Sequence, residues 1–469
     1  MDSRRGRSAV LSWTIAGLVA ISGCAGVAGP AGSRSDAGRS DPVTVTVDLS
    51  GKTLGVLPDR YLGLSFESSS TDSAGDFKDD GNLPRLLKNL GPGVLRFGGN
   101  SVDQSSAAPS QAALAVLAKL VRQTGWNVIF SVSLGRFSAA RAGQDAAEAS
   151  RALGTHLTAI ACGNEPDDFS RNGVRPAGFA ETGYLTQARA CISAIRAAVP
   201  AAGIAGPDTS HLRWLARYAR AAKGSISLLT QHYYPLTDCD NADGTAFALL
   251  SRATAAAEVR RIRLAAAAAR TAGVPLRISE TNSASCGGIP GVSDTFASAL
   301  WAVDYLVTGA EHGASGMNFH DSLTSHCNAY SPICRTGTSY YTARPIYYGL
   351  LFTHLLGTGR LLPVTTRSAA NLAVHAIRSP SGTIRVVIEN LAGQSQTISL
   401  RAGTSSGLAT IVHLTAPSPQ ATSQVRIQGA TLRPTGAFTP GRPGHVACHE
   451  GSCELHLAPY SAAIVTLGR

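Results

Sequence analysis

Residues 127–161 read NVIFSVSLGRFSAARAGQDAAEASRALGTHLTAIA. The stretch opens and closes with short runs of apolar and β-branched residues, 127–133 and 157–161, and an alanine- and arginine-rich segment of helical composition separates them. A strand, a helix and a second strand in this order favour parallel pairing, because the helix returns the chain to the end of the sheet at which it began. The stretch therefore predicts one β–α–β unit.

The same alternation repeats along most of the chain, between residues 61 and 355. Eight β–α units in succession predict a (β/α)8 TIM barrel of the α/β class. A doubly wound open sheet is the alternative, but it needs a glycine-rich phosphate loop after the first run, and GLSFE at 63–67 is not one. The eight runs are 62–66, 94–97, 127–133, 157–161, 203–206, 227–230, 276–279 and 315–319, and the plainest helical stretches are 110–124, 183–198, 252–272 and 294–307.

The sequence pattern changes after residue 355. Short alternating runs separated by Gly, Pro and Ser turns are typical of an all-β sandwich. The sequence VTVTVDL at 43–49 also alternates strictly, and we expect this strand to join the C-terminal sheet. The predicted parts are an N-terminal strand at 42–50, a catalytic barrel at 51–355 and a C-terminal β-sandwich domain at 356–469, with runs at 372–377, 384–389, 396–400, 409–414 and 464–467.

The first 24 residues have the pattern of a signal peptide. Three arginines precede an apolar run at 9–21, which ends in Ile-Ser-Gly-Cys24. This ending resembles a lipobox, in which the cysteine is lipidated and becomes the first residue of the mature chain; an ordinary signal peptide with an incidental cysteine is the alternative. Residues 25–41, rich in Gly, Ala and Ser, are expected to form a flexible tether. We therefore expect an exported protein, held on the outer face of the cell membrane by a lipid at Cys24.

Cys24 aside, the chain keeps eight of its nine cysteines, an even number that is typical of disulfides in an exported protein. No Cys-x-x-Cys pattern indicates zinc. Among many possible connectivities, closeness in the chain predicts Cys327–Cys334 and Cys448–Cys453, and elimination then predicts Cys162–Cys191 and Cys239–Cys286.

Composition narrows the class of protein further. Apolar residues make up 44% of the chain and charged residues 15%, which suits a compact globular fold. The formal charge of +11 is scattered, with no long basic block, so a solvated basic surface explains it, although an acidic polysaccharide or an anionic cell surface would also suit it. Nucleic acid is not expected as a partner, because no motif supports it.

Two glutamates stand where a barrel of this kind carries its active groups, at the carboxyl ends of strands. Glu165 follows the fourth run in the sequence ACGNEP, and Glu280 ends the seventh run in LRISE. Glycoside hydrolysis needs one carboxylic acid to protonate the leaving oxygen and a second carboxylate to stabilise or attack the anomeric carbon. Either glutamate alone could be structural, but two of them, with Asn164 before the first, predict a catalytic pair.

Four motifs extend this pattern: LRFGGN at 95–100, GNEP at 163–166, QHYY at 231–234 and ETNSASCGG at 280–288. Together they resemble glycoside hydrolase family 79, a clan A family that includes β-glucuronidases and heparanases, and the resemblance spans roughly residues 43–469. The chain departs from the heparanases at SCGG (285–288), where they have three glycines, and at Phe319, where they have tyrosine. These departures favour the bacterial β-glucuronidases.

The resemblance implies a role for each matching residue. It makes Glu165 the acid/base and Glu280 the nucleophile, and it implies neither a cofactor nor a metal ion. A metal held by His232, His320 and Glu67 is the alternative for those side chains. The implied substrate contacts are Asn164 to the sugar 2-hydroxyl, Glu67 and Asn100 to other hydroxyls, Tyr233 beside the nucleophile, the backbone N–H groups of Gly287 and Gly288 to the uronic carboxylate, and the Tyr330 hydroxyl.

The sequence thus predicts a retaining, exo-acting β-glucuronidase that cleaves terminal glucuronic acid or its 4-O-methyl form. An endo-β-glucuronidase, or another clan A glycosidase acting on a neutral sugar, is the alternative within this class. A surface carbohydrate-binding lipoprotein without activity is the alternative from another class, and the presence of Glu165, Glu280 and Asn164 counts against it.

Overall fold

A computed structural model describes residues 42–72, 77, 81–104, 108–237, 239, 244–337, 340–403 and 407–468. The predicted signal segment with Cys24 and the tether at 25–41 lie outside the described residues. The residues from Pro42 onward form one compact unit, which is described below. Within the described ranges, no helix is long and apolar enough to cross a membrane.

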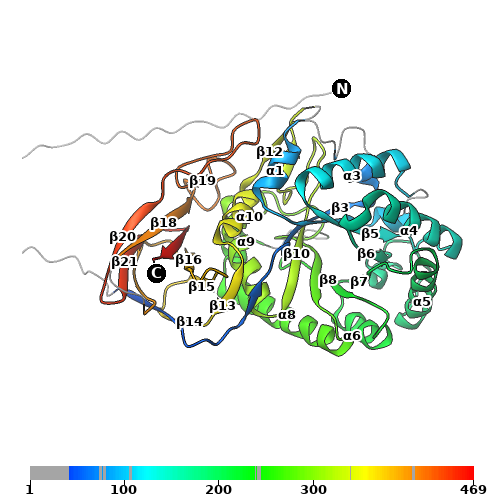
Figure 1. Cartoon of the computed structure of the whole chain (residues 1–469), viewed down its shortest axis with the longest axis horizontal. Coiled ribbons are helices and arrows are strands. Elements are labelled where there is room, and N and C mark those ends of the chain that lie inside the picture. Colours follow the sequence, from blue (N-terminus) through cyan, green and yellow to red (C-terminus); the bar gives the residue numbers. More distant parts are fainter. Residues whose placement is uncertain are drawn as a thin grey trace, which may run out of the picture. The chain divides into compact units, whose positions relative to one another are not determined.

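Eight parallel strands close into a barrel, each pairing with its neighbour in chain order until β10 meets β3 (Figure 1). Each of the eight predicted runs forms one of these strands, so the (β/α)8 prediction is confirmed and the doubly wound alternative is wrong. The strands are β3 (Leu62–Glu67), β4 (Val94–Gly98), β5 (Asn127–Val132), β6 (Leu157–Cys162), β7 (Ile204–Thr209), β8 (Leu228–Tyr233), β9 (Leu276–Thr281) and β10 (Ala314–His320).

Helices surround the barrel, and local signals set their ends. In α8 the side chain of Ser251 accepts from the Thr254 N–H at the first turn, and Gly273 ends the helix in the left-handed conformation (φ 75°). The helices are α1 (Leu83–Asn89), α2 (Ser101–Gln104), α3 (Gln111–Thr124), α4 (Ala139–Leu153), α5 (Glu181–Ala198), α6 (Leu212–Ala221), α7 (Ala246–Leu249), α8 (Arg252–Ala272), α9 (Phe296–Glu311) and α10 (Pro345–Leu356), with 3-10 turns η1 (Ser68–Asp72), η2 (Gly154–His156) and η3 (Pro166–Asp168).

The C-terminal part is one curled, mostly antiparallel sheet of twelve strands. As predicted, the N-terminal strand β1 completes it, between β14 and β17. The sheet also takes in β2, which pairs with β13 although its residues fall in the range expected for the barrel. The strands are β1 (Val43–Val47), β2 (Gly55–Leu57), β13 (Gly359–Leu362), β14 (Val364–Arg367), β15 (Leu372–Arg378), β16 (Ile384–Asn390), β17 (Gln396–Arg401), β18 (Gly407–Thr415), β19 (Arg426–Ile427), β20 (Gly444–His449), β21 (Ser452–Leu457) and β22 (Ser461–Leu467); β11 (Ile333–Arg335) and β12 (Tyr341–Ala343) form a separate hairpin.

The two faces of the curled sheet belong to different cores. In β16, Val387 and Leu391, just past its end, pack into the core of the barrel, whereas Val386 and Ile388 pack into the core enclosed by the sheet. This is the two-residue period of a strand that is buried on both faces. Of the barrel helices, α9 contacts the sheet through β2 and β15, and α10 contacts it through β16, β18 and β19.

All four predicted disulfides are present: Cys162–Cys191, Cys239–Cys286, Cys327–Cys334 and Cys448–Cys453. The first joins the end of β6 to α5, and the second joins the loops that follow β8 and β9. Four disulfides in one chain are typical of an extracellular protein. The second one also restrains the loops beside the candidate active site.

Candidate active site

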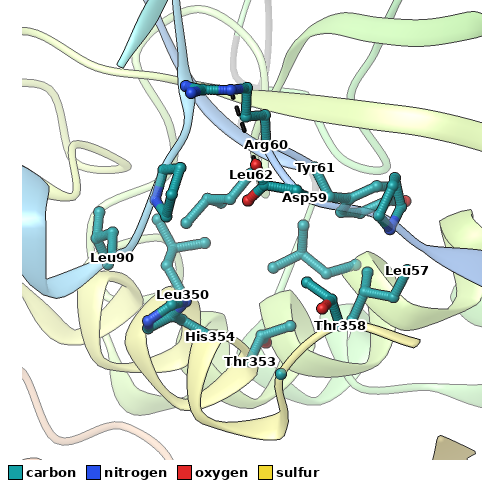
Figure 2. A pocket seen from close by; sticks show the side chains of 14 residues that line it. Leu57, Asp59, Arg60, Tyr61, Leu62, Leu90, Leu350, Thr353, His354 and Thr358 are labelled. Atoms are coloured by element: carbon teal, nitrogen blue, oxygen red, sulfur yellow. Dashed lines mark ion pairs between the residues drawn. The ribbon is translucent and has the colours of Figure 1, made fainter. Parts of the chain in front are cut away.

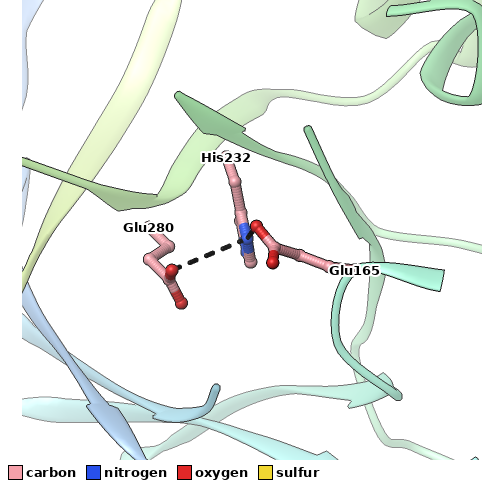
Figure 3. Close-up of side chains that lie close together, drawn as sticks. All are labelled: Glu165, His232 and Glu280. Atoms are coloured by element: carbon pink, nitrogen blue, oxygen red, sulfur yellow. Dashed lines mark hydrogen bonds and ion pairs between the residues drawn. The ribbon is translucent and has the colours of Figure 1, made fainter. Parts of the chain in front are cut away.

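Glu165 and Glu280 meet at the carboxyl ends of the barrel strands. His232, at the end of β8, lies between them, with its Nδ1 3.0 Å from Glu165 Oε1 and 3.9 Å from Glu280 Oε1 (Figure 3). One oxygen of each carboxylate and one ring nitrogen of His232 all lie within 4.8 Å of one another. Such a separation of carboxylates suits a retaining glycosidase, in which they stand about 5–5.5 Å apart.

The backbone at Glu165 has an uncommon conformation. Its φ of 47° lies in the left-handed region, two residues after Gly163 with φ 74° and just before η3 begins at Pro166. A non-glycine residue there costs roughly 1–2 kcal/mol, and the Glu165 N–H compensates by donating to the Asp208 carbonyl oxygen at 2.8 Å. Strained residues of this kind cluster at functional sites, since the surrounding structure must hold them.

Arg96 on β4 connects the groups of the site, and the sequence analysis gave it no role. The side chain is fully buried and donates to Glu280 Oε2 at 2.7 Å, Asp208 Oδ2 at 2.8 Å and Asn164 Oδ1 at 2.7 Å. Breaking a buried charge pair of this kind costs about 3–5 kcal/mol, because the remaining charge stays unpaired. A signal was available in the sequence: an arginine inside the apolar run VLRFG must find buried carboxylates.

The pKa of Glu280 is held well below its usual range. Burial alone would raise this pKa, but His320, His232 and Arg96 outweigh it. Nδ1 of His320 lies 3.2 Å from Glu280 Oε2, and the Tyr234 hydroxyl donates to Oε1 at 2.8 Å. Glu280 is therefore ionised at neutral pH and fixed from several sides.

The pKa of Glu165 moves in the opposite direction. Burial raises it, the charge of Glu280 raises it further, and His232 partly opposes both effects. His232 itself is buried, which lowers its pKa, but Glu280, Asp208 and Glu165 raise that pKa to about 10. The charged imidazole donates its Nδ1–H to Glu165 Oε1, which leaves the other oxygen of Glu165 to carry a proton. Two glutamates with pKa values pushed apart are the arrangement that acid catalysis beside a nucleophile requires.

The predicted contacts to sugar hydroxyls lie around this pair. Because Asn164 Oδ1 accepts from Arg96, its amide Nδ2 is the group that faces the exposed Asn100, whose Oδ1 is 3.4 Å away. Glu67 accepts from the N–H groups of Asn100 and Ser101 at the start of α2. These contacts give Glu67 a local structural role and bring it to the site next to Asn100.

Tyr234, and not Tyr233, lies against the nucleophile, so the prediction for Tyr233 is corrected. The ring of Tyr233 packs near Tyr305 and under the guanidinium of Arg261 at 5.6 Å. Alternate side chains of a strand point to opposite faces, and His232 already points into the barrel. Tyr234 shares that direction, whereas Tyr233 points outward toward α8.

The turn after β9 is built from residues with positive φ: Cys286 (54°), Gly287 (97°) and Gly288 (83°). The Gly288 N–H donates to the Ser285 carbonyl oxygen at 3.2 Å, so the prediction that it binds a substrate carboxylate is not supported, and the prediction for the Gly287 N–H stays a prediction. Tyr330 is buried, stacked on Tyr234 with ring centroids 6.3 Å apart. Its hydroxyl accepts from Asn328, also in the loop after β10.

The site residues do not fit a metal ion, although Glu165, His232 and Glu280 lie close enough to hold one. Arg96 already places a positive charge 2.7 Å from Glu280, and His232 is a second cation between the two glutamates. A divalent cation would have to approach two fixed positive charges. The arrangement suits an acid and a nucleophile that act without a metal ion.

A separate cavity lies at the amino-terminal end of the barrel, beside the segment that leads into β3. It has a volume of about 220 Å³ and is lined by Asp59, Arg60 and Tyr61 and by Leu350 and His354 of α10 (Figure 2). Arg60 and Asp59 pair across 3.8 Å there. In barrels of this type the amino-terminal face serves stability and not chemistry.

Solved glycosidase structures share the overall fold. A 4-O-α-L-rhamnosyl-β-D-glucuronidase from Fusarium oxysporum aligns with 90% of this chain and 100% of its own, with a TM-score of 0.77 and 21% identity. A family 51 α-L-arabinofuranosidase from Bifidobacterium longum aligns with 92% of this chain and 100% of its own, with a TM-score of 0.70 and 15% identity. At these identities the likeness establishes the fold.

Sequence similarity points to one group of these enzymes. β-Glucuronidases from Aspergillus niger and Neurospora crassa are each 27% identical to this chain, over 123 and 140 residues. The matches cover 26% and 27% of this chain, and only 23% and 25% of the length of these relatives. No family model matches the chain. The similarities confirm the resemblance to β-glucuronidases that the motifs carry.

Proposed function

We propose that the protein is a retaining glycoside hydrolase that removes terminal β-linked glucuronic acid. One observation carries the proposal: Glu165, with a raised pKa, and Glu280, with a lowered pKa, present carboxylate oxygens within 4.8 Å of each other at the mouth of the barrel. An acid and a nucleophile at this spacing support a double displacement with retention.

In the first step Glu280 attacks the anomeric carbon while Glu165 gives its proton to the glycosidic oxygen. The carbon–oxygen bond breaks, the aglycone leaves as an alcohol, and a glycosyl ester forms on Glu280. The negative charge of Glu280 is then gone, so the pKa of Glu165 falls and its carboxylate accepts a proton from water. The oxygen of that water attacks the same carbon, releasing the sugar and regenerating both groups.

Three observations favour a uronic acid as the sugar. The two relatives and the Fusarium structure are named glucuronidases. The chain carries a net charge of +11, which suits an acidic substrate. Tyr330 is near enough to Glu280 to feel its charge, and the Tyr330 N–H donates to the Gly287 carbonyl oxygen at 3.3 Å, which supports a carboxylate site formed by this tyrosine and the Gly287 turn. We propose in addition that a lipid at Cys24 holds the enzyme on the outer face of the membrane.

A panel of p-nitrophenyl glycosides tests the substrate. Cleavage of the β-glucuronide alone, with the β-glucuronic acid product formed first, is the expected result. Equal cleavage of neutral β-glycosides would instead support another clan A glycosidase, and cleavage only within longer glucuronate polymers would support endo action. Sugar binding without any cleavage would refute the proposed hydrolase activity and support a carbohydrate-binding lipoprotein.

We expect a bell-shaped dependence of kcat/KM on pH. Activity needs Glu280 ionised, so it falls in acid only below the lowered pKa of that group, and it needs Glu165 protonated, so it falls as pH rises through the raised pKa of Glu165. His232 lowers both pKa values, so in His232→Gln both limbs should move to higher pH. Steady-state rates across pH check this, and limbs that stay in place would contradict the role of His232.

Tyr234→Phe removes the hydrogen bond to Glu280 Oε1, and its matched control is Tyr233→Phe on the opposite face of the strand. A hydrogen bond to a charged group is worth about 1.5–3 kcal/mol, so kcat should fall roughly 10- to 100-fold in Tyr234→Phe. Tyr233→Phe should stay near wild type. The opposite ranking in steady-state assays would restore Tyr233 as the residue beside the nucleophile.

A further inference from the structure

A second group of titratable side chains lies where the curled sheet packs on the barrel. His375 on β15 and Glu389 on β16 belong to the sheet, and Asp304 and Glu311 lie on α9. The two acids of α9 are seven residues apart and therefore share one face of the helix. His375 and Glu389 have the same parity in their strands as Ile377 and Val387, which pack into the barrel core. We call these four residues the interdomain cluster.

The histidine of the cluster is held by a carboxylate on each side. His375 Nδ1 lies 2.9 Å from Glu311 Oε1, and Nε2 lies 2.9 Å from Asp304 Oδ1. The imidazole is therefore fixed in orientation, with Nε2 on the side of Asp304. One ligand atom each from Asp304, His375 and Glu389 all lie within 4.8 Å of one another.

Glu389 is the anomaly in this arrangement. The side chain is 0% exposed, and neither of its carboxylate oxygens has a hydrogen-bond partner. Burying a carboxylate without a partner is expensive, and buried unsatisfied groups of native proteins usually mark an ion or a special role. Three carboxyl groups, those of Asp304, Glu311 and Glu389, also share a single imidazole. The Glu389 carboxyl group therefore lacks the partner that its burial requires.

We propose that the interdomain cluster binds a zinc ion through Asp304, Glu389 and Nε2 of His375. Glu311 then accepts from the Nδ1–H of the same ring, which completes the carboxylate–histidine–metal arrangement that orients histidine ligands in proteins. One imidazole with two carboxylates suits Zn²⁺ better than Ca²⁺, which takes six to eight oxygens. Zinc bonds of about 2.0–2.1 Å require the ligand atoms to stand roughly 3.3 Å apart. Asp304 Oδ1 and His375 Nε2 are 2.9 Å apart, and all three ligand atoms lie within 4.8 Å of one another.

Room for a water ligand and a route of entry lie next to the cluster. A cavity of about 70 Å³ is lined by Asp304 together with Glu258, Trp301 and Ala373. A water molecule in it could fill the fourth position of a tetrahedral ion. Bound there, zinc would join α9 of the barrel to β15 and β16, so its effect is on the attachment of the sheet to the barrel and is independent of glycoside cleavage.

The test is metal content and thermal unfolding of the full chain. After dialysis against a chelator and re-addition of Zn²⁺, we expect one zinc ion per chain by mass spectrometry of the metal, and a rise of roughly 2–5 °C in the apparent unfolding midpoint. Ca²⁺ should produce a smaller rise. The eight cysteines of the described region are all in disulfides, so thiolates there do not compete for zinc. A zinc content well below one per chain, or a response to Ca²⁺ alone, would overturn the proposal.

Variants locate the site. Glu389→Gln and His375→Gln should each lose the ion and the zinc-dependent rise, whereas Glu181→Gln, which alters a buried glutamate paired with Arg213 and Arg217 on another side of the barrel, should keep both. Undiminished zinc binding by Glu389→Gln would place the ion elsewhere. A chelated Glu389→Gln protein that is more stable than the zinc-loaded wild type would show that Glu389 holds a shared proton instead. Should both variants fail to fold, visible absorption of Co²⁺ bound at one equivalent to wild type supports a nitrogen–oxygen site, and its absence overturns it.

Discussion

Replacing Glu280 by glycine should lower kcat on a β-glucuronide by about 10⁴-fold or more, because no other group of the site can form the covalent intermediate. The ionised carboxylate is oriented by Arg96 at 2.7 Å and by Tyr234 at 2.8 Å, and a neutral neighbour cannot take its place. Azide should restore activity, since a small anion fits the space that the side chain leaves. It would attack the face that Glu280 normally attacks, so the product should be the α-glycosyl azide.

A fold control is needed, because Glu280 also balances the charge of Arg96. Asp208 keeps that arginine paired in the variant. The loss of stability measured by thermal unfolding should therefore be smaller than if both partners of Arg96 were removed. Glu280→Gln, which keeps the shape of the side chain, should be as inactive as the glycine variant but should not respond to azide. Activity of Glu280→Gly within tenfold of wild type, in a protein that unfolds normally, would remove Glu280 from the mechanism.

The barrel and its two glutamates could be predicted because both depend on signals along the chain. Each barrel strand is a short apolar run, and strands in parallel order bring their carboxyl ends to one face. Glu165 and Glu280 therefore had to approach each other once their strands were recognised. The helix α8 was also predictable to its ends, because Ser251 and Gly273 mark them.

The hydrogen-bond partners of Arg96 could not be predicted from the sequence. That its guanidinium reaches Asp208 and Glu280 depends on the alignment of non-neighbouring strands, and β7 and β8 carry register shifts that no periodic pattern shows. The error at Tyr233 has a related cause, since one position along a strand turns a side chain to the opposite face. The strand β2 was assigned to the barrel range because three residues are too few to show alternation.

Replacing Glu165 by alanine should lower activity to an extent that depends on the leaving group of the substrate. Glycosides with a poor leaving group, such as an alkyl alcohol or a second sugar, need its proton and should lose about 10²–10⁴-fold in kcat/KM. Dinitrophenolate can leave without that proton, so the first step on a dinitrophenyl glucuronide should remain fast. Hydrolysis of the ester on Glu280 then lacks a base, and a burst of dinitrophenol followed by a slow steady rate is the expected time course.

Azide separates the two glutamates, because it acts on different faces of the sugar in the two variants. In Glu165→Ala it should attack the glycosyl ester from the side of the missing acid/base and give the β-glycosyl azide, the opposite anomer to that from Glu280→Gly. The basic limb of the pH profile should disappear as well, since the raised pKa of Glu165 produces it. The same anomer from both variants, or an unchanged basic limb, would mean that the proton comes from another group, and His232, 3.0 Å from Glu165, would be the next residue to replace.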